Sequence, residues 1–242
     1  IVPEHTTFVV DLDVSESPDY ASRRIWYGYG LSDHNRTAYS DWIEKNRMGG
    51  GFALNTGHAY GRLIRAQQAV FDAHPEYYAL VDGKRHIHPD AKLCIANPGV
   101  HEAAIAYALA FFAENPDADS VSMDPSDGGG WCECEDCARL GPPNDRATIL
   151  ANAVAEALVA KLGPTRYVGM YAYAYHSEPP RVKVHSNLIV SVATGFIKGG
   201  HTVEAILAGW AKQGAALGIR EYYSVNTWDR DLPGAARGGN LD

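Results

Sequence analysis

The chain has 242 residues, of which 46% are hydrophobic, and it carries a formal net charge of −8 with a pI of about 5.6. This composition suits a globular protein with a sizeable core, and one domain is the simplest expectation because barrels of about 200–250 residues fold as single units. The acidic balance without a Lys/Arg cluster argues against nucleic acid, and no stretch approaches the roughly 18 apolar residues that span a bilayer, so we expect neither a nucleic-acid nor a membrane partner.

The beginning of the chain differs in pattern from the rest. Residues 6–12 form a short β run and residues 15–19 are polar, so we expect residues 1–18 to be a linker or the tail of a preceding module. The chain starts at Ile1 without a Met or a basic stretch, and we expect no signal peptide within it.

Strands and helices are predicted to alternate from residue 19 to residue 242. Asn97 and Pro98 indicate the N-cap and the first residue of one helix, and Gly163 and Gly218 indicate the C-caps of two others. The predicted strands cover residues 23–29, 51–55, 92–96, 120–123, 167–175, 187–192 and 219–224. The predicted helices cover residues 37–48, 60–73, 100–114, 145–162 and 202–217.

This alternation predicts a parallel sheet with helices outside it. We therefore expect an α/β fold of the (β/α)8 TIM-like barrel type over residues 19–242. The chain provides about seven strands, so we expect the last strand and helix of the barrel to be lacking. An open, doubly wound sheet is the alternative, but no Gly-x-Gly-x-x-Gly pattern follows a first strand.

The segment after the predicted strand 120–123 carries two carboxylates beside three glycines. Barrel enzymes hold their active sites at the carboxyl ends of strands, so Asp127 and Asp124 are candidate catalytic residues. The glycines at 128–130 let the backbone approach a ligand closely. Two other interpretations stay open here: an Asp/Gly turn with solvated carboxylates, and a Ca²⁺ loop, although the spacing does not match an EF-hand.

The four cysteines of the chain come from two neighbouring parts of the predicted sheet. Cys94 lies in one predicted strand, and Cys132, Cys134 and Cys137 follow the next. Four thiolates at this spacing suit a tetrahedral zinc site, which would be structural because no position is left open for water. The alternatives are two disulfides, which secreted enzymes favour, and free buried thiols.

Several other strand ends carry side chains suited to a sugar ligand. Aromatic rings stack on the apolar C–H faces of sugars, and tyrosine hydroxyls and histidines bond to sugar hydroxyls. An arginine can hold an acidic sugar group through a bidentate pair. The candidate substrate-binding residues are Arg24, His58, Trp131, Tyr173, His176 and Trp228, and Asp229 is a candidate second catalytic carboxylate.

Four pieces of the chain carry a family resemblance: residues 74–85, 93–100, 115–119 and 127–137, with the motifs Pro-Glu-Tyr…Asp-Gly-Lys and Gly-Gly-Trp-Cys-x-Cys. Over roughly residues 20–240 the sequence resembles the bacterial family DUF4838, which is similar to α-glucuronidase and family-20-type glycoside hydrolase barrels. The resemblance implies a barrel fold, a polysaccharide setting, an acid at Asp127 and a last strand beyond the end of the chain. We accordingly expect a secreted or periplasmic bacterial protein.

These observations favour a glycoside hydrolase that acts on a polysaccharide or oligosaccharide, with uronic-acid-containing glycans among the candidates. We expect Asp127 to be the acid, kept protonated by burial near Trp131, and Asp229 or Asp124 to be the second carboxylate. One alternative is a non-catalytic carbohydrate-binding barrel. Another is a metal-dependent hydrolase that uses His58 and His176. Apart from structural zinc no cofactor is expected, and the expected partner is the carbohydrate.

Overall fold

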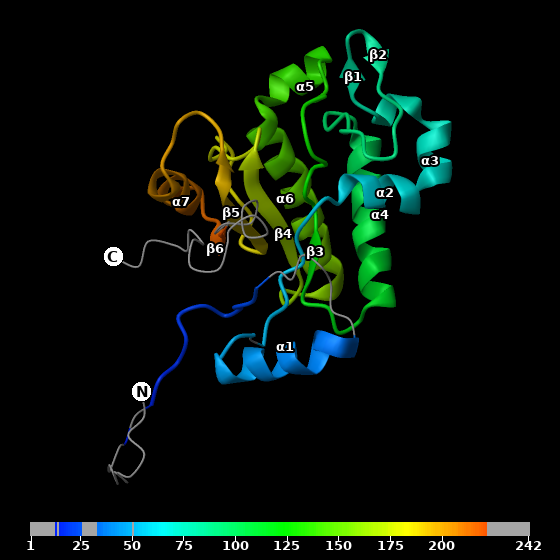
Figure 1. Cartoon of the computed structure of the whole chain (residues 1–242). Helices are drawn as coiled ribbons and strands as arrows, with labels where there is room; N and C mark the ends of the chain where they lie inside the picture. Colours follow the sequence, from blue (N-terminus) through cyan, green and yellow to red (C-terminus); the bar gives the residue numbers. More distant parts are fainter. Residues whose placement is uncertain (1–12, 14, 26–32, 50, 222–242) are drawn as a thin grey trace. The chain divides into compact units, whose positions relative to one another are not determined.

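The computed structural model describes residues 13, 15–25, 33–49 and 51–221 (Figure 1). The chain divides into two compact units, Ile1–Phe52 and Ala53–Asp242. The helices are α1 (Asp33–Lys45), α2 (Tyr60–Ala66), α3 (Gln68–Ala73), the 3-10 turn η1 (Pro75–Tyr77), α4 (Pro98–Glu114), α5 (Glu135–Leu140), α6 (Pro143–Leu162) and α7 (Val203–Lys212). The strands are β1 (Leu80–Val81), β2 (Lys84–Arg85), β3 (Ser120–Ser122), β4 (Tyr167–Ala174), β5 (Leu188–Ile197) and β6 (Ala216–Arg220).

The first unit contains α1, which confirms the predicted helix over residues 37–48 and begins four residues earlier. Of the predicted strand over residues 23–29, the described part contributes an isolated antiparallel bridge between Arg23 and Gly49. Arg23 reinforces this bridge because its guanidinium donates to the carbonyl of Arg47. The β run predicted over residues 6–12 lies outside the described residues.

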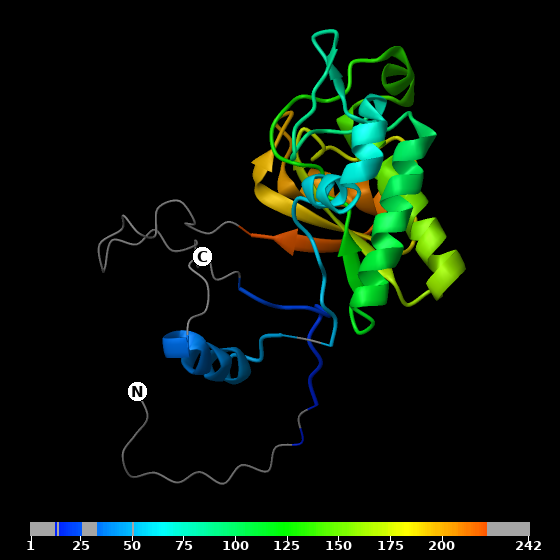
Figure 2. The same cartoon turned by 90° about the vertical axis from the view of Figure 1, so that its right-hand side faces the viewer.

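A four-stranded parallel sheet forms the centre of the second unit, in the order β3-β4-β5-β6 (Figure 2). Ser120 pairs with Tyr167, Val168 with Leu188, and Ile189 with Ala216, so each strand lies beside its successor in the sequence. The protein is therefore a mixed α/β protein, and the predicted parallel sheet is confirmed. The connection from β3 to β4 contains α5 and α6, and that from β5 to β6 contains α7.

Two long helices, α4 and α6, pack against each other beside the sheet (Figure 1). As predicted, Asn97 caps α4, since its side chain accepts a 2.9 Å hydrogen bond from the Gly99 amide, and Pro98 occupies the first turn. The predicted end of α6 at Gly163 is also confirmed, with a left-handed φ of +93° that glycine adopts without strain. No helix of the described residues is long and apolar enough to cross a membrane.

The predicted strand over residues 51–55 is wrong as a strand, although the segment is extended. Its backbone amides donate hydrogen bonds to side chains in and next to β3, and not to the backbone of a neighbouring strand. The Ala53 amide donates to the Asp119 carboxylate at 2.7 Å, and the Asn55 amide donates to the Ser120 hydroxyl at 2.6 Å. The segment also crosses β4 closely, since a Cβ on Gly169 would lie 2.1 Å from the Asn55 carbonyl oxygen.

Three other predicted boundaries need correction. The run over residues 92–96 makes only an isolated bridge, Leu93 with Tyr78, and the Cys94 side chain packs in the cluster of cysteines. The helix over residues 60–73 is confirmed but breaks at Gln67, between α2 and α3. The helix predicted to reach residue 217 ends at residue 212, so Gly218 lies in β6 and is not a C-cap.

Candidate functional site

Asp124 lies just beyond β3, where it is almost fully buried. Its carboxylate accepts hydrogen bonds from the backbone amides of Gly57 and Tyr171 and, at 3.4 Å, from the Ser122 hydroxyl. Burial raises the pKa of Asp124 to about 6, although these hydrogen bonds act in the opposite direction. Both carboxylate oxygens are thus occupied by protein donors, and the interpretation of Asp124 as a solvated turn residue is wrong.

Asp127 and His58 meet in the loops at the carboxyl end of the sheet. Nε2 of His58 lies 3.1 Å from Oδ2 of Asp127, and Nδ1 of His58 lies 3.1 Å from the carbonyl oxygen of Pro125. The two side chains are 52% and 64% exposed, so the expected burial of Asp127 is wrong and a ligand can reach both groups. The structure does bring these two predicted residues together.

The partners of His58 determine where its protons lie. A carbonyl oxygen can only accept a hydrogen bond, so Nδ1 of His58 carries a proton and donates it to Pro125. Nε2 of His58 and the Asp127 carboxylate lie close enough to exchange a proton, and both groups are exposed. An accessible pair of this kind suits acid/base chemistry.

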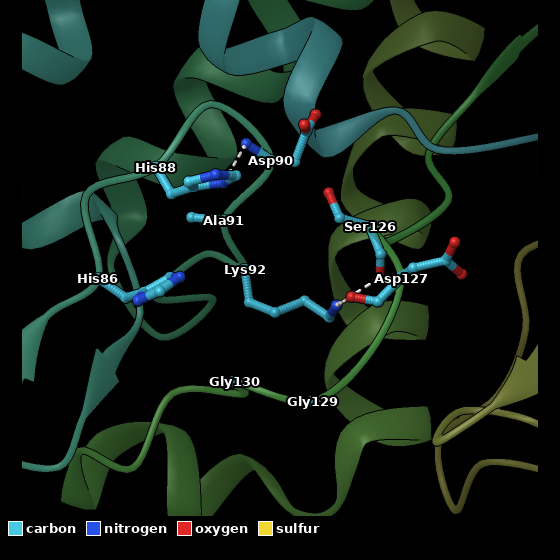
Figure 3. A pocket seen from close by; sticks show the side chains of 9 residues that line it. All are labelled: His86, His88, Asp90, Ala91, Lys92, Ser126, Asp127, Gly129 and Gly130. Atoms are coloured by element: carbon cyan, nitrogen blue, oxygen red, sulfur yellow. Dashed lines mark hydrogen bonds between the residues drawn. The ribbon is translucent and has the colours of Figure 1, made fainter.

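A pocket of about 280 Å³ opens beside this pair (Figure 3). On one side lies the segment leading to α4, and on the other the loop after β3. Its lining includes His86, His88, Asp90, Lys92, Ser126 and Asp127. Figure 3 shows the Lys92 side chain extended toward the loop, with the Asp127 carboxylate pointing away from it. The pocket therefore contains basic groups as well as the predicted acid.

Lys92 is a buried lysine that sequence reasoning missed. Its ammonium donates to the backbone carbonyls of Ser126 and, at 2.8 Å, Asp127, and it lies 5.5 Å from the ring centroid of Trp131. Burial lowers the pKa of Lys92 to about 8, while the charge of Asp127 acts to raise it. The signal that could have found it is a single lysine within the apolar run Ala-Lys-Leu-Cys-Ile-Ala.

Three predicted sugar-binding side chains gather beside the pocket. The ring centroid of His176 lies 6.0 Å from that of Trp131 and 6.2 Å from that of Tyr173. Tyr173 also contacts Phe196, with 5.0 Å between ring centroids. Burial lowers the pKa of His176 to about 3, and the charges of Lys92 and His58 add to this effect, so His176 is neutral near pH 7.

Buried polar atoms without a protein partner mark the same region. Ser126 Oγ, Trp131 Nε1 and His176 Nε2 have no hydrogen-bond partner among the described residues. Buried polar groups in folded proteins are nearly always satisfied, so water or a ligand is expected to complete them. The cluster therefore offers unused hydrogen-bonding capacity next to aromatic faces.

Three other predicted residues belong to other parts of the chain. Arg24 is exposed and belongs to the first compact unit. Trp228 and Asp229 lie outside the described residues. The predicted second carboxylate is therefore represented, among the described residues, only by Asp124, whose oxygens are already bonded to the protein.

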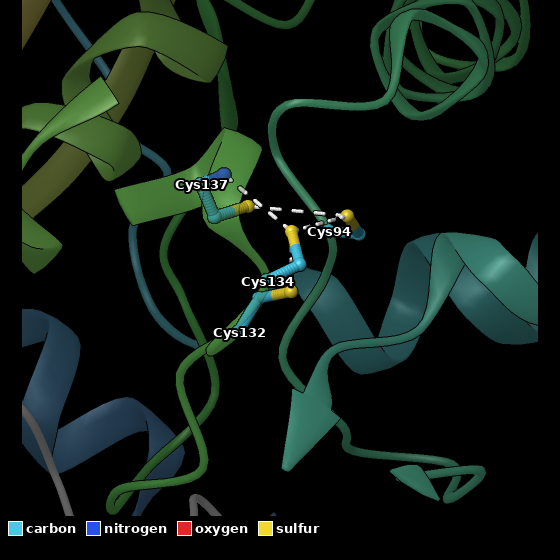
Figure 4. Close-up of side chains that lie close together, drawn as sticks. All are labelled: Cys94, Cys132, Cys134 and Cys137. Atoms are coloured by element: carbon cyan, nitrogen blue, oxygen red, sulfur yellow. Dashed lines mark hydrogen bonds between the residues drawn. The ribbon is translucent and has the colours of Figure 1, made fainter. Parts of the chain in front are cut away.

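The four cysteine thiols converge on one point (Figure 4). All four sulfurs lie within 4.8 Å of one another, and the cysteines are free of disulfides. Backbone amides point at three of the sulfurs: Leu80 donates to Cys132 at 3.3 Å, Ala96 to Cys137 at 3.4 Å, and Cys137 to Cys134 at 3.4 Å. Hydrogen bonds from the Cys137 and Cys94 thiols hold the pKa of Cys132 below its usual value.

The spacing of these sulfurs fits a metal ion. In a tetrahedron with metal–sulfur bonds of about 2.3 Å, the sulfurs lie about 3.8 Å apart. The observed separations are 3.4 Å for Cys132–Cys134, 3.6 Å for Cys94–Cys134 and 3.9 Å for Cys94–Cys137. The cluster can therefore hold a metal ion. No other group of three or more His, Cys, Asp or Glu ligands forms within the described ranges, so His58 and His176 do not build a second such site there.

Comparison with known proteins gives a family but no characterised relative. No curated protein and no solved structure matches the chain. A family described as a domain of unknown function, DUF4838, matches residues 1–226. Since this match spans most of the chain, the protein belongs to the DUF4838 family.

Proposed function

We propose that this protein is a glycoside hydrolase, acting on a polysaccharide or oligosaccharide with Asp127 as the general acid. The observation that carries the proposal is the 3.1 Å contact between Nε2 of His58 and Oδ2 of Asp127 at the carboxyl end of a parallel sheet, beside a pocket. Aromatic faces at Trp131 and Tyr173 and unpartnered polar atoms nearby provide the two kinds of contact that a sugar needs.

In the proposed reaction Asp127 donates its proton to the glycosidic oxygen as the bond between that oxygen and the anomeric carbon breaks. A water molecule supplies the hydroxyl that the anomeric carbon gains, and its remaining proton returns to the carboxylates. His58 holds Asp127 in place and exchanges the proton with it. Asp229 is our candidate for the second carboxylate, since the oxygens of Asp124 are bonded to backbone amides.

The experiment is reducing-sugar release by the full chain from a panel of neutral and uronic-acid-bearing glycans. We expect Asp127→Asn to lower the rate by about 10²–10⁴-fold, the usual contribution of a general acid. Asp117→Asn is the matched control, because Asp117 is an exposed aspartate outside the site. Unchanged release by Asp127→Asn across the panel contradicts the proposal.

A non-catalytic carbohydrate-binding protein is the second candidate. This candidate is favoured because both carboxylate oxygens of Asp124 accept hydrogen bonds from backbone amides. Asp124 is therefore not available as the second catalytic carboxylate beside Asp127. Hydrolysis needs two carboxyl groups about 5–9.5 Å apart across the bond. Glycan binding by the wild type that persists in Asp127→Asn, with no sugar released by either, would support binding over hydrolysis.

We also propose that the parallel sheet is part of a (β/α) barrel. Four strands in sequential order, with chemically active groups after their carboxyl ends, support this architecture. A crystal structure that defines what lies beside β6 tests it, since barrel closure requires a further parallel strand at that edge. An antiparallel strand or a covering helix at that edge argues against a barrel.

We propose that the four cysteines bind a structural zinc ion. The support is the spacing of the sulfurs and the presence of four free thiols. Four thiolates fill all the positions of a tetrahedral zinc ion, so none is left for a water molecule. The zinc would hold Cys94 to the loop over residues 132–137 and so fix two walls of the pocket. We expect about one zinc per chain and four reactive thiols after denaturation with a chelator and without a reductant. A metal-free protein with fewer than four thiols indicates disulfides instead.

A further inference from the structure

Lys92 carries a positive charge that forms no ion pair within the described part of the chain. Its side chain is buried, and the ion pairs there do not include it. An ammonium has three hydrogen-bond donors, and two are used by the carbonyls of Ser126 and Asp127. A buried charge without a counter-ion is costly, so a group that supplies negative charge would be held firmly here.

The acids that line the same pocket already have basic partners. The Asp90 carboxylate lies 3.1 Å from the Arg65 guanidinium, and the Asp127 carboxylate faces His58 at 3.1 Å. The Asp127 side chain also points away from Lys92 (Figure 3). Lys92 therefore lines the pocket without an ion pair of its own, and His86 and His88 line the same pocket.

Ser126 adds a second, independent indication of a ligand. Ser126 is among the residues that line the pocket, and its hydroxyl is buried and has no hydrogen-bond partner among the described residues. A hydroxyl donor and an ammonium from residues that line one pocket suit one anionic group with two or more oxygens. The pocket volume of about 280 Å³ is close to the lower end of small-molecule sites, about 300 Å³, which suits one sugar unit.

We infer that this pocket binds an anionic group on a sugar unit, with Lys92 as its counter-ion and Ser126 as a hydroxyl donor. This inference rests on the proposed function and names the class of substrate as acidic glycans. Lys92 is then a specificity-determining residue, in place of the arginine expected from the sequence. Because Lys92 also holds the carbonyls of Ser126 and Asp127, an anion bound here fixes the loop that carries the acid.

Binding of three probes by calorimetry tests the inference: D-glucuronate and D-glucose 6-sulfate as acidic sugars, and D-glucose as the neutral control. We expect at least one acidic sugar to bind the full chain about 10-fold or more tightly than glucose, as a hydrogen bond to a charged group allows. Which acidic sugar binds more tightly identifies the anionic group. Equal binding of all three probes overturns the inference.

Variants assign the preference to the pocket. Lys92→Gln should abolish the preference for the acidic sugar, while Lys84→Gln, which removes an exposed lysine from β2, should keep it. Ser126→Ala should weaken acidic-sugar binding by about 3–10-fold and leave glucose unchanged. Since Lys92 also holds a loop, circular dichroism checks that Lys92→Gln folds. If Lys92→Gln does not fold, the result for Ser126→Ala decides whether the inference stands. A preference unaffected by Ser126→Ala and by a folded Lys92→Gln contradicts the inference.

These results separate the inference from the proposed hydrolysis. Acidic-sugar binding that needs Lys92, without release of sugar by the wild type, keeps the inference and removes the hydrolase. Release of sugar from acidic glycans at the same rate by wild type and by a folded Lys92→Gln keeps the hydrolase and removes the inference.

Discussion

The sheet with its packed helices and the layer at its carboxyl end are held together by different forces. The sheet region, β3–β6 with α4 and α6, buries contiguous apolar side chains such as Leu150 and Val190. The carboxyl-end layer, residues 74–96 and 124–141, has little regular structure and is held by side chains bonded to backbone, by thiols and by the buried ammonium of Lys92. The stability of the fold therefore lies mainly in one region and the chemistry in the other.

Removal of the proposed zinc should have the largest effect, and it should be confined to the carboxyl-end layer. Structural zinc contributes about 10–16 kcal/mol in zinc-finger peptides, so chelation should speed amide exchange around Cys94 and Cys137 by on the order of 100-fold or more. Amides of α6 and β4 should keep their protection because their packing does not involve the thiols. Hydrogen exchange followed by mass spectrometry measures the protection of both regions. An equal loss of protection in the two regions would contradict the proposed difference between them.

Truncation of a core leucine should destabilise the whole unit instead. Leu150 is fully buried in α6, and Leu150→Ala should lower the free energy of unfolding by about 2–5 kcal/mol. Leu162→Ala on the same helix is the matched control, since Leu162 is 42% exposed and should cost less than about 1 kcal/mol. Urea denaturation gives both values, and similar losses for the two variants would contradict the assignment of the core.

The pH dependence of stability should report on Asp124. Its pKa is raised to about 6, so between about pH 4 and pH 6 the folded state keeps a proton that the unfolded state releases. Stability of the wild type should therefore fall with rising pH, relative to Asp124→Asn, by up to about 3 kcal/mol. Urea denaturation at several pH values measures the difference, and parallel profiles for the two proteins would show that Asp124 titrates normally.

The smallest expected effect is at the cap of α4. The Asn97 side chain accepts the Gly99 amide, and Asn97→Ala should cost about 1 kcal/mol. Since Asn97 also lies near the thiol cluster in sequence, amide exchange distinguishes fraying of the helix from opening of the layer. Faster exchange confined to the first turn of α4 supports the capping role. An Asn97→Ala variant as stable as the wild type would contradict that role.

Sequence reasoning succeeded where signals are local. The caps at Asn97 and Gly163 and the strand at residues 120–123 depend on neighbours along the chain, and the structure has them. The strand prediction for residues 51–55 is wrong because the backbone amides of this segment donate to the side chains of Asp119 and Ser120. Residue propensities carry no information about such long-range hydrogen bonds.

The site shows the same division. The strand-end rule placed Asp127 at the carboxyl end of β3. His58 meets Asp127 there although the segment before His58 is not a strand of the sheet. The burial of Asp124 was not predicted and the expected burial of Asp127 is wrong, because each depends on how distant loops fold over the sheet. Lys92 escaped notice because its role comes from contacts with Ser126 and Asp127, more than 30 positions away.

The most direct test of the account is a crystal structure of Asp127→Asn with an acidic oligosaccharide bound. We expect a glycosidic oxygen within about 2.6–3.2 Å of the residue-127 side chain, with an anionic group of the sugar at Lys92. An oligosaccharide bound elsewhere, with residue 127 and Lys92 both free of sugar, would contradict it.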